Sequence, residues 1–435
     1  RRKFELAQMR TLMAALGDPQ QHLRSVLIAG TNGKGSTAST LASILAASGL
    51  RTGLYTSPHL VRVNERMRIL SRTPGTDLDV TDSQIPDDDF SLHLEAVIHA
   101  AERLVSEGHL PGQPSFFETV TAMAFLHFAA AKVDIAVLEV GLGGRLDATN
   151  IVEPVLSIIT DISLDHTEWL GHTITEIARE KAGILRENGV LVILPQHPEA
   201  NQVIGEAAMA LNVRAIDATA ALPYVTHEVT NTHNRYPLDV VAGKEQRLHI
   251  EVDSPLAGQH QQRNIALAIM AALELRNRYS YDISATSIAA GIRQTRWPAR
   301  LEKLSHNSRS ILLDVGHNPA GAWTLRAALA TEQHSPRNLI FGCLDDKPVE
   351  ELAQILFPLF ERVLLVPVPS PRAASGSRLL AAAQSVGANA GLQPNLAAAL
   401  QALPQSEDAV ITGSVYLVGE ARGLLMGEGW TSDAG

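Results

Sequence analysis

Short runs of β-branched and aliphatic residues alternate along this chain with alanine-rich stretches of helical length, and this alternation is its most constraining feature. Helices are predicted near Ser36–Ser48 and Ile174–Leu185, the second opened by the capping-box pair Thr173 and Glu176. The predicted strands are Ser25–Ala29, Thr52–Thr56, Ile135–Val140, Val155–Thr160 and Val190–Leu194. Strands that alternate with helices predict an α/β fold with a mostly parallel, doubly wound sheet.

The same rhythm restarts in the last third of the chain. The later predicted strands are Ser310–Val315, Asn338–Gly342, Val363–Val366 and Ala409–Thr412. A chain of 435 residues is too long for one ordinary core. We therefore expect an N-terminal domain over residues 1–297 and a smaller C-terminal domain over residues 298–435. The boundary is placed near Trp297–Arg300, where Pro298 is expected to break the preceding helix.

Two other segments stand apart from this rhythm. Ser71–Asp89 is rich in Asp, Thr, Ser and Pro and is predicted to be an exposed insertion. Leu222–Val252 has shorter alternating patches, which favour an antiparallel edge.

Charge and composition exclude several classes of protein. A net charge of −10 argues against a nucleic-acid surface but leaves room for a nucleotide held by a few local cations. No uncharged apolar stretch of about 18 residues predicts a membrane span. The single cysteine, Cys343, cannot form an internal disulfide, and Arg1–Met9 lacks the apolar run of a secretory signal. We expect a cytoplasmic protein and, because the chain opens without a methionine, native residues upstream.

The strongest local motif is a glycine-rich loop between the first strand and the first helix. It reads Gly30-Thr31-Asn32-Gly33-Lys34-Gly35-Ser36-Thr37. Glycines let backbone amides approach phosphate oxygens, and Lys34 can neutralise the β and γ phosphates. A hydroxyl of Ser36 or Thr37 can face Mg²⁺. The alternative is an ordinary glycine-rich turn, but the strand–loop–helix context favours phosphate binding. Gly35 stands between Lys34 and Ser36, unlike the common GxxxxGK[ST] loop, which weakens a GTPase or kinase interpretation.

Polar side chains follow the strands that are predicted next to this loop. Glu139 ends one apolar run, and His166 follows another beside Asp165. Ligands of open α/β sheets bind at the carboxyl ends of strands, and Mg²⁺ prefers carboxylate oxygens. Glu139 could instead pair with Arg145, and His166 could be a structural residue. The residues alone indicate only an exposed helical position for Lys181.

Several ordered blocks together resemble the folylpolyglutamate synthase and dihydrofolate synthase family, a branch of the Mur ligases. The resemblance runs from about Phe4 to Gly419. Besides the loop, the blocks are Thr56–Leu60, Asn64–Arg66, Ser115–Thr119, Leu138–Asn150, Asp165-His166, Glu180–Gly183, Trp297–Arg300 and Asp314–Pro319.

This resemblance implies a P-loop ATPase domain of the Mur-ligase type followed by a smaller Rossmann-like α/β domain, with the site between them. It also implies specific residue roles. The catalytic residues would be Lys34, His317 and Arg300. The ATP-binding residues would be Thr31, Asn32, Gly33, Lys34, Gly35, Ser36, Asn264, Arg300 and Asp314. The metal ligands would be Ser57, Glu139, His166 and Lys181, the last after N-carboxylation of its ε-amine. The residues lining the pterin-bearing substrate would be Ser115, Phe116, Phe117, Glu118, Leu146, Asp147 and Ala148.

The expected reaction joins L-glutamate to the γ-carboxylate of a folate through an acyl phosphate. The expected cofactors are ATP as co-substrate and Mg²⁺ at two sites, with room for a monovalent cation. The expected partners are small molecules only (folate or dihydropteroate, L-glutamate and ATP) and the chain is expected to be a monomer. Two rival interpretations are another Mur-type ligase acting on a peptidoglycan precursor, and a P-loop nucleotide-binding protein without ligase activity.

Three departures from the family pattern bear on these expectations. Ala299 stands where the family has glycine, which should require only a local backbone adjustment. The Ser71–Gln84 segment is longer than usual. The N-terminal Lys3–Gln8 stretch lacks the Asp-Leu-Gly pattern of bifunctional members, which puts dihydrofolate synthase activity in doubt.

Overall fold

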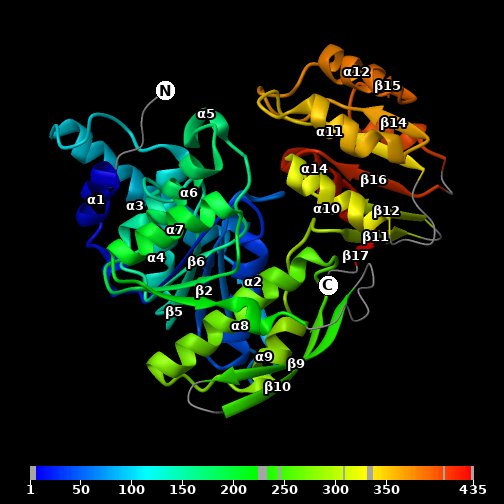
Figure 1. Cartoon of the computed structure of the whole chain (residues 1–435). Helices are drawn as coiled ribbons and strands as arrows, with labels where there is room; N and C mark the ends of the chain where they lie inside the picture. The colour runs from blue at the N-terminus through cyan, green and yellow to red at the C-terminus, as the bar shows by residue number, and fades with distance from the viewer. Residues whose placement is uncertain are drawn as a thin grey trace.

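The computed structural model describes residues 6–223, 233–242, 246–306, 309–330, 337–404 and 407–432. Residues 3–5 of the N-terminal stretch, and residues 224–232 and 243–245 of the expected antiparallel segment, lie outside these ranges. The described residues form an eight-stranded sheet, a two-stranded sheet and a seven-stranded sheet. Figure 1 shows the two large sheets as separate bodies, with the later part of the chain, in yellow to red, beside the earlier part.

The first sheet has the strand order β4-β3-β2-β5-β1-β6-β7-β8. Its strands are β1 (Ser25–Ala29), β2 (Thr52–Tyr55), β3 (Met67–Arg72), β4 (Val80–Gln84), β5 (Ile135–Glu139), β6 (Leu156–Ile159), β7 (Val190–Ile193) and β8 (Arg214–Asp217). All neighbours from β2 to β8 pair in parallel, while β3 and β4 continue the sheet antiparallel. The prediction of a mostly parallel sheet is confirmed.

Helices cover both faces of this sheet, as the uninterrupted burial of β1 requires. Leu27 and Ala29 join one apolar cluster, and Val26 and Ile28 join the other, because successive side chains point to opposite faces. The first face carries α1 (Leu6–Ala15), α3 (Asp87–Ser106), α4 (Phe116–Ala130), α6 (Ile174–Ala182) and α7 (Pro198–Ala210). The second face carries α2 (Lys34–Ala47), α8 (His260–Tyr279) and α9 (Ala285–Arg293).

Two expectations about irregular segments need correction. Ser71–Asp89 is not simply an exposed insertion, because it contains β4 and the start of α3. Leu222–Val252 does contribute antiparallel strands, β9 (Asn234–Ala242) and β10 (Gln246–Ser254), but among the described residues they pair only with each other and form no edge of the large sheet. Figure 1 shows this hairpin beside α9.

The second large sheet has the order β15-β14-β13-β16-β12-β11-β17. Its strands are β11 (Glu302–His306), β12 (Arg309–Leu313), β13 (Asn338–Phe341), β14 (Arg362–Leu365), β15 (Ala390–Leu392), β16 (Ala409–Thr412) and β17 (Thr431–Ser432). Its helices are α10 (Pro319–Leu329), α11 (Val349–Leu356), α12 (Gly376–Ser385), α13 (Leu396–Ala402) and α14 (Val415–Gly427). The strands from β15 to β12 are parallel, and β11 and β17 are antiparallel. The strand–helix restart is confirmed, although it begins one strand earlier than predicted.

The segment between α9 and β11 joins the two large sheets. Helix α9 ends at Arg293, so Pro298 does not terminate it as expected; the helix has already ended when the chain reaches Trp297. We propose that residues 1–297 and 298–435 form the two domains, because this joining segment lies between their cores. Among the described residues, no helix combines the length and apolarity that a membrane crossing needs.

The close approach of α9 to α2 should depend on a glycine. A Cβ atom at Gly291 would lie 2.4 Å from the Ile44 Cα. We expect Gly291→Ala to lower the free energy of unfolding by about 1–3 kcal/mol, because backbone atoms cannot move aside as a flexible side chain can. The matched control is Gly205→Ala in α7, where no atom of the described residues lies within 4 Å of the added Cβ. In that variant the free energy of unfolding should rise by roughly 0.5–1 kcal/mol, because alanine has a higher helix propensity than glycine. If urea denaturation gave equal changes in the free energy of unfolding for the two variants, the close packing of Gly291 against Ile44 would be contradicted.

Candidate functional site

The glycine-rich loop runs from the end of β1 to the start of α2, as predicted. The amides of Thr31 and Asn32 both donate to the Asp161 carbonyl oxygen, at 2.9 and 3.1 Å, which ties the loop to the end of β6. Gly33 is the N-cap of α2 with φ +87°, and no side chain caps the first turn. The amides at the start of α2 are therefore available to bind an anion, which the helix dipole also favours.

Two side chains from later in the chain pack closely against the loop. A Cβ atom at Gly33 would lie 2.2 Å from the Asn264 Oδ1, and one at Gly35 would lie 2.2 Å from a Trp297 ring carbon. Asn264 belongs to α8 and Trp297 to the joining segment. Both glycines are therefore required by close approach, and Gly33 also by its left-handed backbone.

Two lysines converge on the first glycine of the loop. Lys34 Nζ donates to the carbonyl oxygens of Gly30 and Thr31 at 3.0 and 3.1 Å. Lys181 Nζ donates to the same Gly30 oxygen at 2.7 Å. The interpretation of Lys181 as an exposed helical residue is wrong: its side chain is buried. Burial, together with the charge of Lys34, lowers the pKa of Lys181 to about 7.

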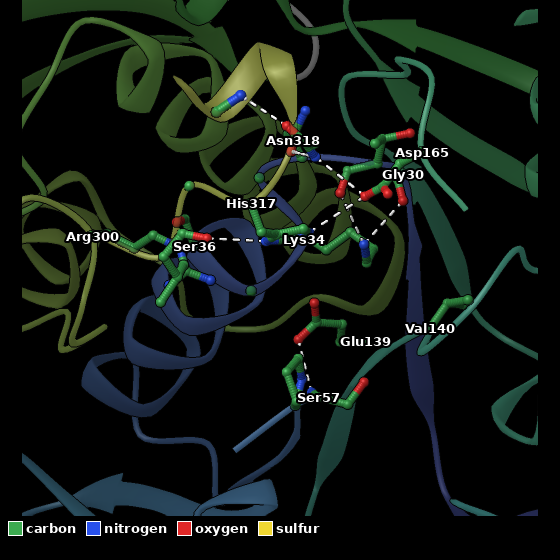
Figure 2. A pocket seen from close by; sticks show the side chains of 18 of the residues that line it. Gly30, Lys34, Ser36, Ser57, Glu139, Val140, Asp165, Arg300, His317 and Asn318 are labelled. Atoms are coloured by element: carbon green, nitrogen blue, oxygen red, sulfur yellow. Dashed lines mark hydrogen bonds and ion pairs between the residues drawn. The ribbon is translucent and has the colours of Figure 1, made fainter. Parts of the chain in front are cut away.

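Glu139 and Ser57 form the acidic side of the pocket (Figure 2). The Ser57 amide donates to Glu139 Oε2 at 3.1 Å. Glu139 does not pair with Arg145, which instead contacts Glu180 at 2.9 Å. Burial raises the pKa of Glu139, and the nearby charge of Lys34 opposes that rise. Ser57 Oγ is buried and has no hydrogen-bond partner among the residues that the structure describes.

Asp165 and His166 follow β6 and face the second half of the chain. Desolvation of the ring lowers the pKa of His166 to about 4, although its side chain is 41% exposed, and at pH 7 the neutral ring keeps a lone pair. Asp165 Oδ1 accepts from Lys347 Nζ at 2.9 Å, and Oδ2 lies 3.4 Å from His317 Nε2. Burial alone would raise the pKa of Asp165, but His317 and Lys347 hold it well below its usual range.

The second half contributes a turn after β12 and the segment before β11. Asp314 accepts hydrogen bonds from the amides of Gly316 and Leu301 at 2.8 and 3.0 Å. Burial raises the pKa of Asp314, and Arg300 opposes the rise. Ala299 has φ +60° and is fully buried, so the expected local adjustment is a left-handed backbone at a non-glycine residue.

One cavity of 190 Å³ brings the expected catalytic, ATP-binding and metal residues together. The expected residues in its lining are Thr31, Asn32, Gly33, Lys34, Gly35, Ser36, Ser57, Glu139, His166, Lys181, Asn264, Arg300, Asp314 and His317. They come from both halves of the chain, and Figure 2 shows Lys34, Glu139 and His317 around the same space. The clustering is a finding, while each residue's role remains a prediction.

A second cavity of 640 Å³ adjoins the first and is mostly apolar. Ser57, His166, Arg300 and His317 line both cavities. Of the residues expected to line the pterin-bearing substrate, it includes Phe117, Leu146, Asp147 and Ala148.

Ser115, Phe116 and Glu118 are not brought into this second cavity. The Ser115 amide donates to Glu118 Oε2 at 2.7 Å, and the Glu118 amide donates to Ser115 Oγ at 3.3 Å, so these two residues form the capping box of α4. Phe116 is 59% exposed, with the Arg66 guanidinium 5.3 Å from its ring. The Asp147 carboxylate is also engaged locally, accepting from the amides of Gly141 and Leu142 at 3.0 Å.

Sequence reasoning assigned no role to three residues that the structure places at the centre. Asp165, Asn318 and Lys347 all take part in contacts between the two halves. Asp165 and Asn318 stand inside blocks that carry the family resemblance, which was a usable signal. Lys347 follows β13 in the run Asp345-Asp346-Lys347, and nothing in that run distinguishes it from a surface lysine.

Comparisons with known proteins agree with this architecture. Residues 94–272 match the Mur ligase middle domain, and residues 299–415 match the Mur ligase glutamate ligase domain. The folylpolyglutamate synthase of Lacticaseibacillus casei is 35% identical over 417 residues, covering 96% of this chain and 93% of the relative. The dihydrofolate synthase/folylpolyglutamate synthase of Bacillus subtilis is 33% identical over 430 residues, covering 97% and 94%. A Mycobacterium tuberculosis folylpolyglutamate synthase structure, complexed with ADP and AMPPCP, has a TM-score of 0.85 and 31% identity, covering 97% of this chain and 95% of that one.

The electrostatics of the site can be tested by histidine titration. We expect the His166 ring to titrate near pH 4 in an NMR pH series, because partial desolvation and the nearby charge of Lys347 disfavour its charged form. His249 on β10 is the internal control. Its ring nitrogens lie 3.0 and 2.8 Å from Asp239 and Glu251, which raise its pKa above the ordinary value. Between pH 5 and 6 the His166 ring should therefore be neutral while the His249 ring is charged. His166→Gln assigns the resonance, and titration of His166 above pH 6 would contradict the expected lowering of its pKa by desolvation.

Proposed function

The chain belongs to the folylpolyglutamate synthase and dihydrofolate synthase family of the Mur ligases, and from this membership we propose which substrate each of its two cavities binds. It is an ATP-dependent ligase that joins glutamate to a folate. We propose that the smaller cavity binds ATP and the larger one binds the folate, with the reaction at the residues that line both. The observation that carries the proposal is the pairing of an uncapped helix start and Lys34 with an adjoining apolar cavity.

The proposed reaction has two steps. The γ-phosphoryl group of ATP passes to an oxygen of the folate γ-carboxylate, which gives an acyl phosphate and ADP. The amine of the incoming glutamate then attacks the acyl carbon, and inorganic phosphate leaves from the tetrahedral intermediate. A free carboxylate is a poor electrophile, so this activation supplies the leaving group.

Cations around the smaller cavity suit the charge that develops during phosphoryl transfer. Lys34 lies at the helix start, and Arg300 reaches the same cavity from the second half. His317 lines both cavities and can therefore meet the transferred phosphoryl group and the attacking amine. Fixed positive groups in a water-poor site stabilise such a transition state without reorganisation.

The residues expected to hold magnesium fit a hard cation. Ser57 Oγ is buried without a partner in the described part of the chain, Glu139 is a carboxylate beside it, and His166 is neutral at pH 7. Magnesium, when bound, would neutralise phosphate oxygens. Lys181 fits only after carboxylation, because an ammonium would repel the metal. A second magnesium and a monovalent cation remain proposals.

The larger cavity suits a flat heterocycle with an acidic tail. Its walls include Phe117, Leu146 and Trp169, and its cations include Arg66 and Arg372. Apolar walls with a few convergent charged groups are typical of sites for such ligands. Dihydropteroate, which lacks the glutamate tail, is a second candidate acceptor because the Bacillus subtilis relative is named for both activities. A cytoplasmic location and a monomeric state also stay predictions.

ADP production by the purified protein tests the proposed function. We expect ADP release only when glutamate and a folate are both present, with tetrahydrofolate and a folate diglutamate as the acceptors. Dihydropteroate in the same assay decides the dihydrofolate synthase activity. Release with a peptidoglycan precursor but no folate would favour the rival ligase, and binding of nucleotide without any turnover would favour the non-ligase alternative.

Removing the loop cation should abolish most turnover. We expect Lys34→Ala to lower kcat by roughly 10²–10³-fold, the scale for losing one preorganised charge partner of a transition state. Circular dichroism should show the fold intact. Lys303→Ala is the matched control, because Lys303 is an exposed lysine of β11 away from both cavities. Near-normal turnover by Lys34→Ala would remove the ATP assignment.

Carboxylation of Lys181 should be visible without any assay of turnover. Only the neutral amine reacts with carbon dioxide, and the pKa of Lys181 is lowered to about 7. In ¹³C NMR spectra of the protein in ¹³C-bicarbonate, a carbamate resonance should therefore grow as the pH rises from 6 to 8. Lys181→Arg, which keeps a cation but cannot form the carbamate, should lack the resonance. An active wild-type enzyme without this signal at pH 8 would contradict the carbamate.

A further inference from the structure

The two halves of the chain meet at a small set of buried polar groups between the cavities. Lys347 comes from the segment between β13 and α11, and Asp165 from the loop after β6. Both therefore follow the carboxyl end of a parallel strand, one in each large sheet. Their side chains are 6% and 9% exposed, and Lys347 Nζ lies 2.9 Å from Asp165 Oδ1.

A second contact runs beside this ion pair and reaches the glycine-rich loop. Asn318 Nδ2 donates to Asn32 Oδ1 at 3.0 Å and to Asp165 Oδ2 at 3.2 Å (Figure 2 labels Asp165 and Asn318). Asn318 Oδ1 accepts from the Gly321 amide at 2.8 Å, so the same residue caps α10. A continuous set of hydrogen bonds thus runs from the start of α10 to the loop and to Asp165.

The backbone of the segment that carries Lys347 is held in place by contacts within the second half of the chain. Arg378 of α12 donates to the Lys347 and Asp345 carbonyl oxygens and pairs with Glu350 at 3.2 Å. The Asp345 amide also donates to the Arg372 carbonyl at 2.8 Å. Because the backbone of the segment is braced, little backbone entropy is lost when Lys347 contacts Asp165.

We propose that the Lys347–Asp165 ion pair is a latch that holds the two halves closed over the cavities, with Lys347 and Asp165 acting as positioning residues. The latch keeps Asn318 against Asn32 and so brings His317 and Arg300 up to the glycine-rich loop. Its consequence for turnover rests on the proposed function, while the latch itself exists without substrate.

The burial of the pair explains why it can act this way. Exposed ion pairs contribute little because water and salt screen them, and Arg337–Glu361, 67% and 69% exposed, is such a pair within the second half. The Lys347–Asp165 pair is shielded, and breaking it takes the nearest opposite charge from each buried partner, which leaves Asp165 with His317 at 3.4 Å and Lys347 with Asp346 at 3.8 Å. The closed arrangement should therefore lose much of its population when either partner is removed.

Distances between the halves test the latch directly. Spin labels at Glu102→Cys in α3 and Gln384→Cys in α12 occupy exposed sites, and Cys343 is buried. In substrate-free protein we expect one narrow distance distribution. Lys347→Met should broaden it, Lys347→Arg should keep it narrow, and Arg337→Met, the exposed-pair control, should leave it unchanged. An unchanged distribution in Lys347→Met would overturn the latch, as would equal broadening in Arg337→Met.

Steady-state kinetics then separate positioning from direct substrate binding. Loss of the closed population weakens the binding of every ligand that needs the closed arrangement. In Lys347→Met the KM for ATP and the KM for folate should therefore both rise, roughly tenfold. A rise in one KM alone would mean that Lys347 binds that substrate, and would overturn the positioning role. Asp165→Asn removes the other partner, and the double variant should be no worse than the more affected single variant. Failure of all folates as acceptors would refute the proposed function and leave the distance measurement valid.

Discussion

The hydrogen bonds from the Thr31 and Asn32 amides to the Asp161 carbonyl are the contacts on which the rest of the site depends. They join the ends of β1 and β6, neighbouring parallel strands whose carboxyl ends lie at the same edge. Asp161 is itself held by Arg263 of α8 at 2.6 Å. With the loop fixed in this way, the amides at the start of α2 point into the cavity and Lys34 folds back over the loop.

The site contains several cationic side chains, although the chain as a whole carries a net negative charge. The chain carries a net charge of −10, yet Lys34, Lys181 and Arg300 line one cavity. Acidic groups there are each held by specific partners: Glu139 by the Ser57 amide, and Asp314 by the amides of Gly316 and Leu301. Those partners compensate the desolvation of the carboxylates, while Lys34 and Lys181 donate to backbone carbonyl oxygens of the loop rather than pairing with these acids.

The structure explains two departures from the family pattern, the alanine at position 299 and the long Ser71–Gln84 segment. Ala299 adopts a left-handed backbone that glycine would adopt without strain, and its amide donates to the buried Glu302 at 2.8 Å. The long Ser71–Gln84 segment adds β4 to the sheet edge, and Gln294 fastens it to the end of α9 through the Val80 amide and the Leu78 carbonyl. The segment thus braces the residues that lead to Trp297 and the loop.

The sequence by itself determined the α/β class, most strand positions, the capping box of α6 and the position of the phosphate loop. These follow from hydrophobic period, glycine placement and capping chemistry, which act over a few residues. It also placed Glu139 and His166 at strand ends. Only the tertiary structure decided that Lys181 is buried against Gly30, that Ser115 and Glu118 cap α4 rather than line the cavity, and that Lys347 reaches Asp165 across the two halves. Such contacts join residues far apart in the chain, and their energies depend on burial, which no local pattern of residues encodes.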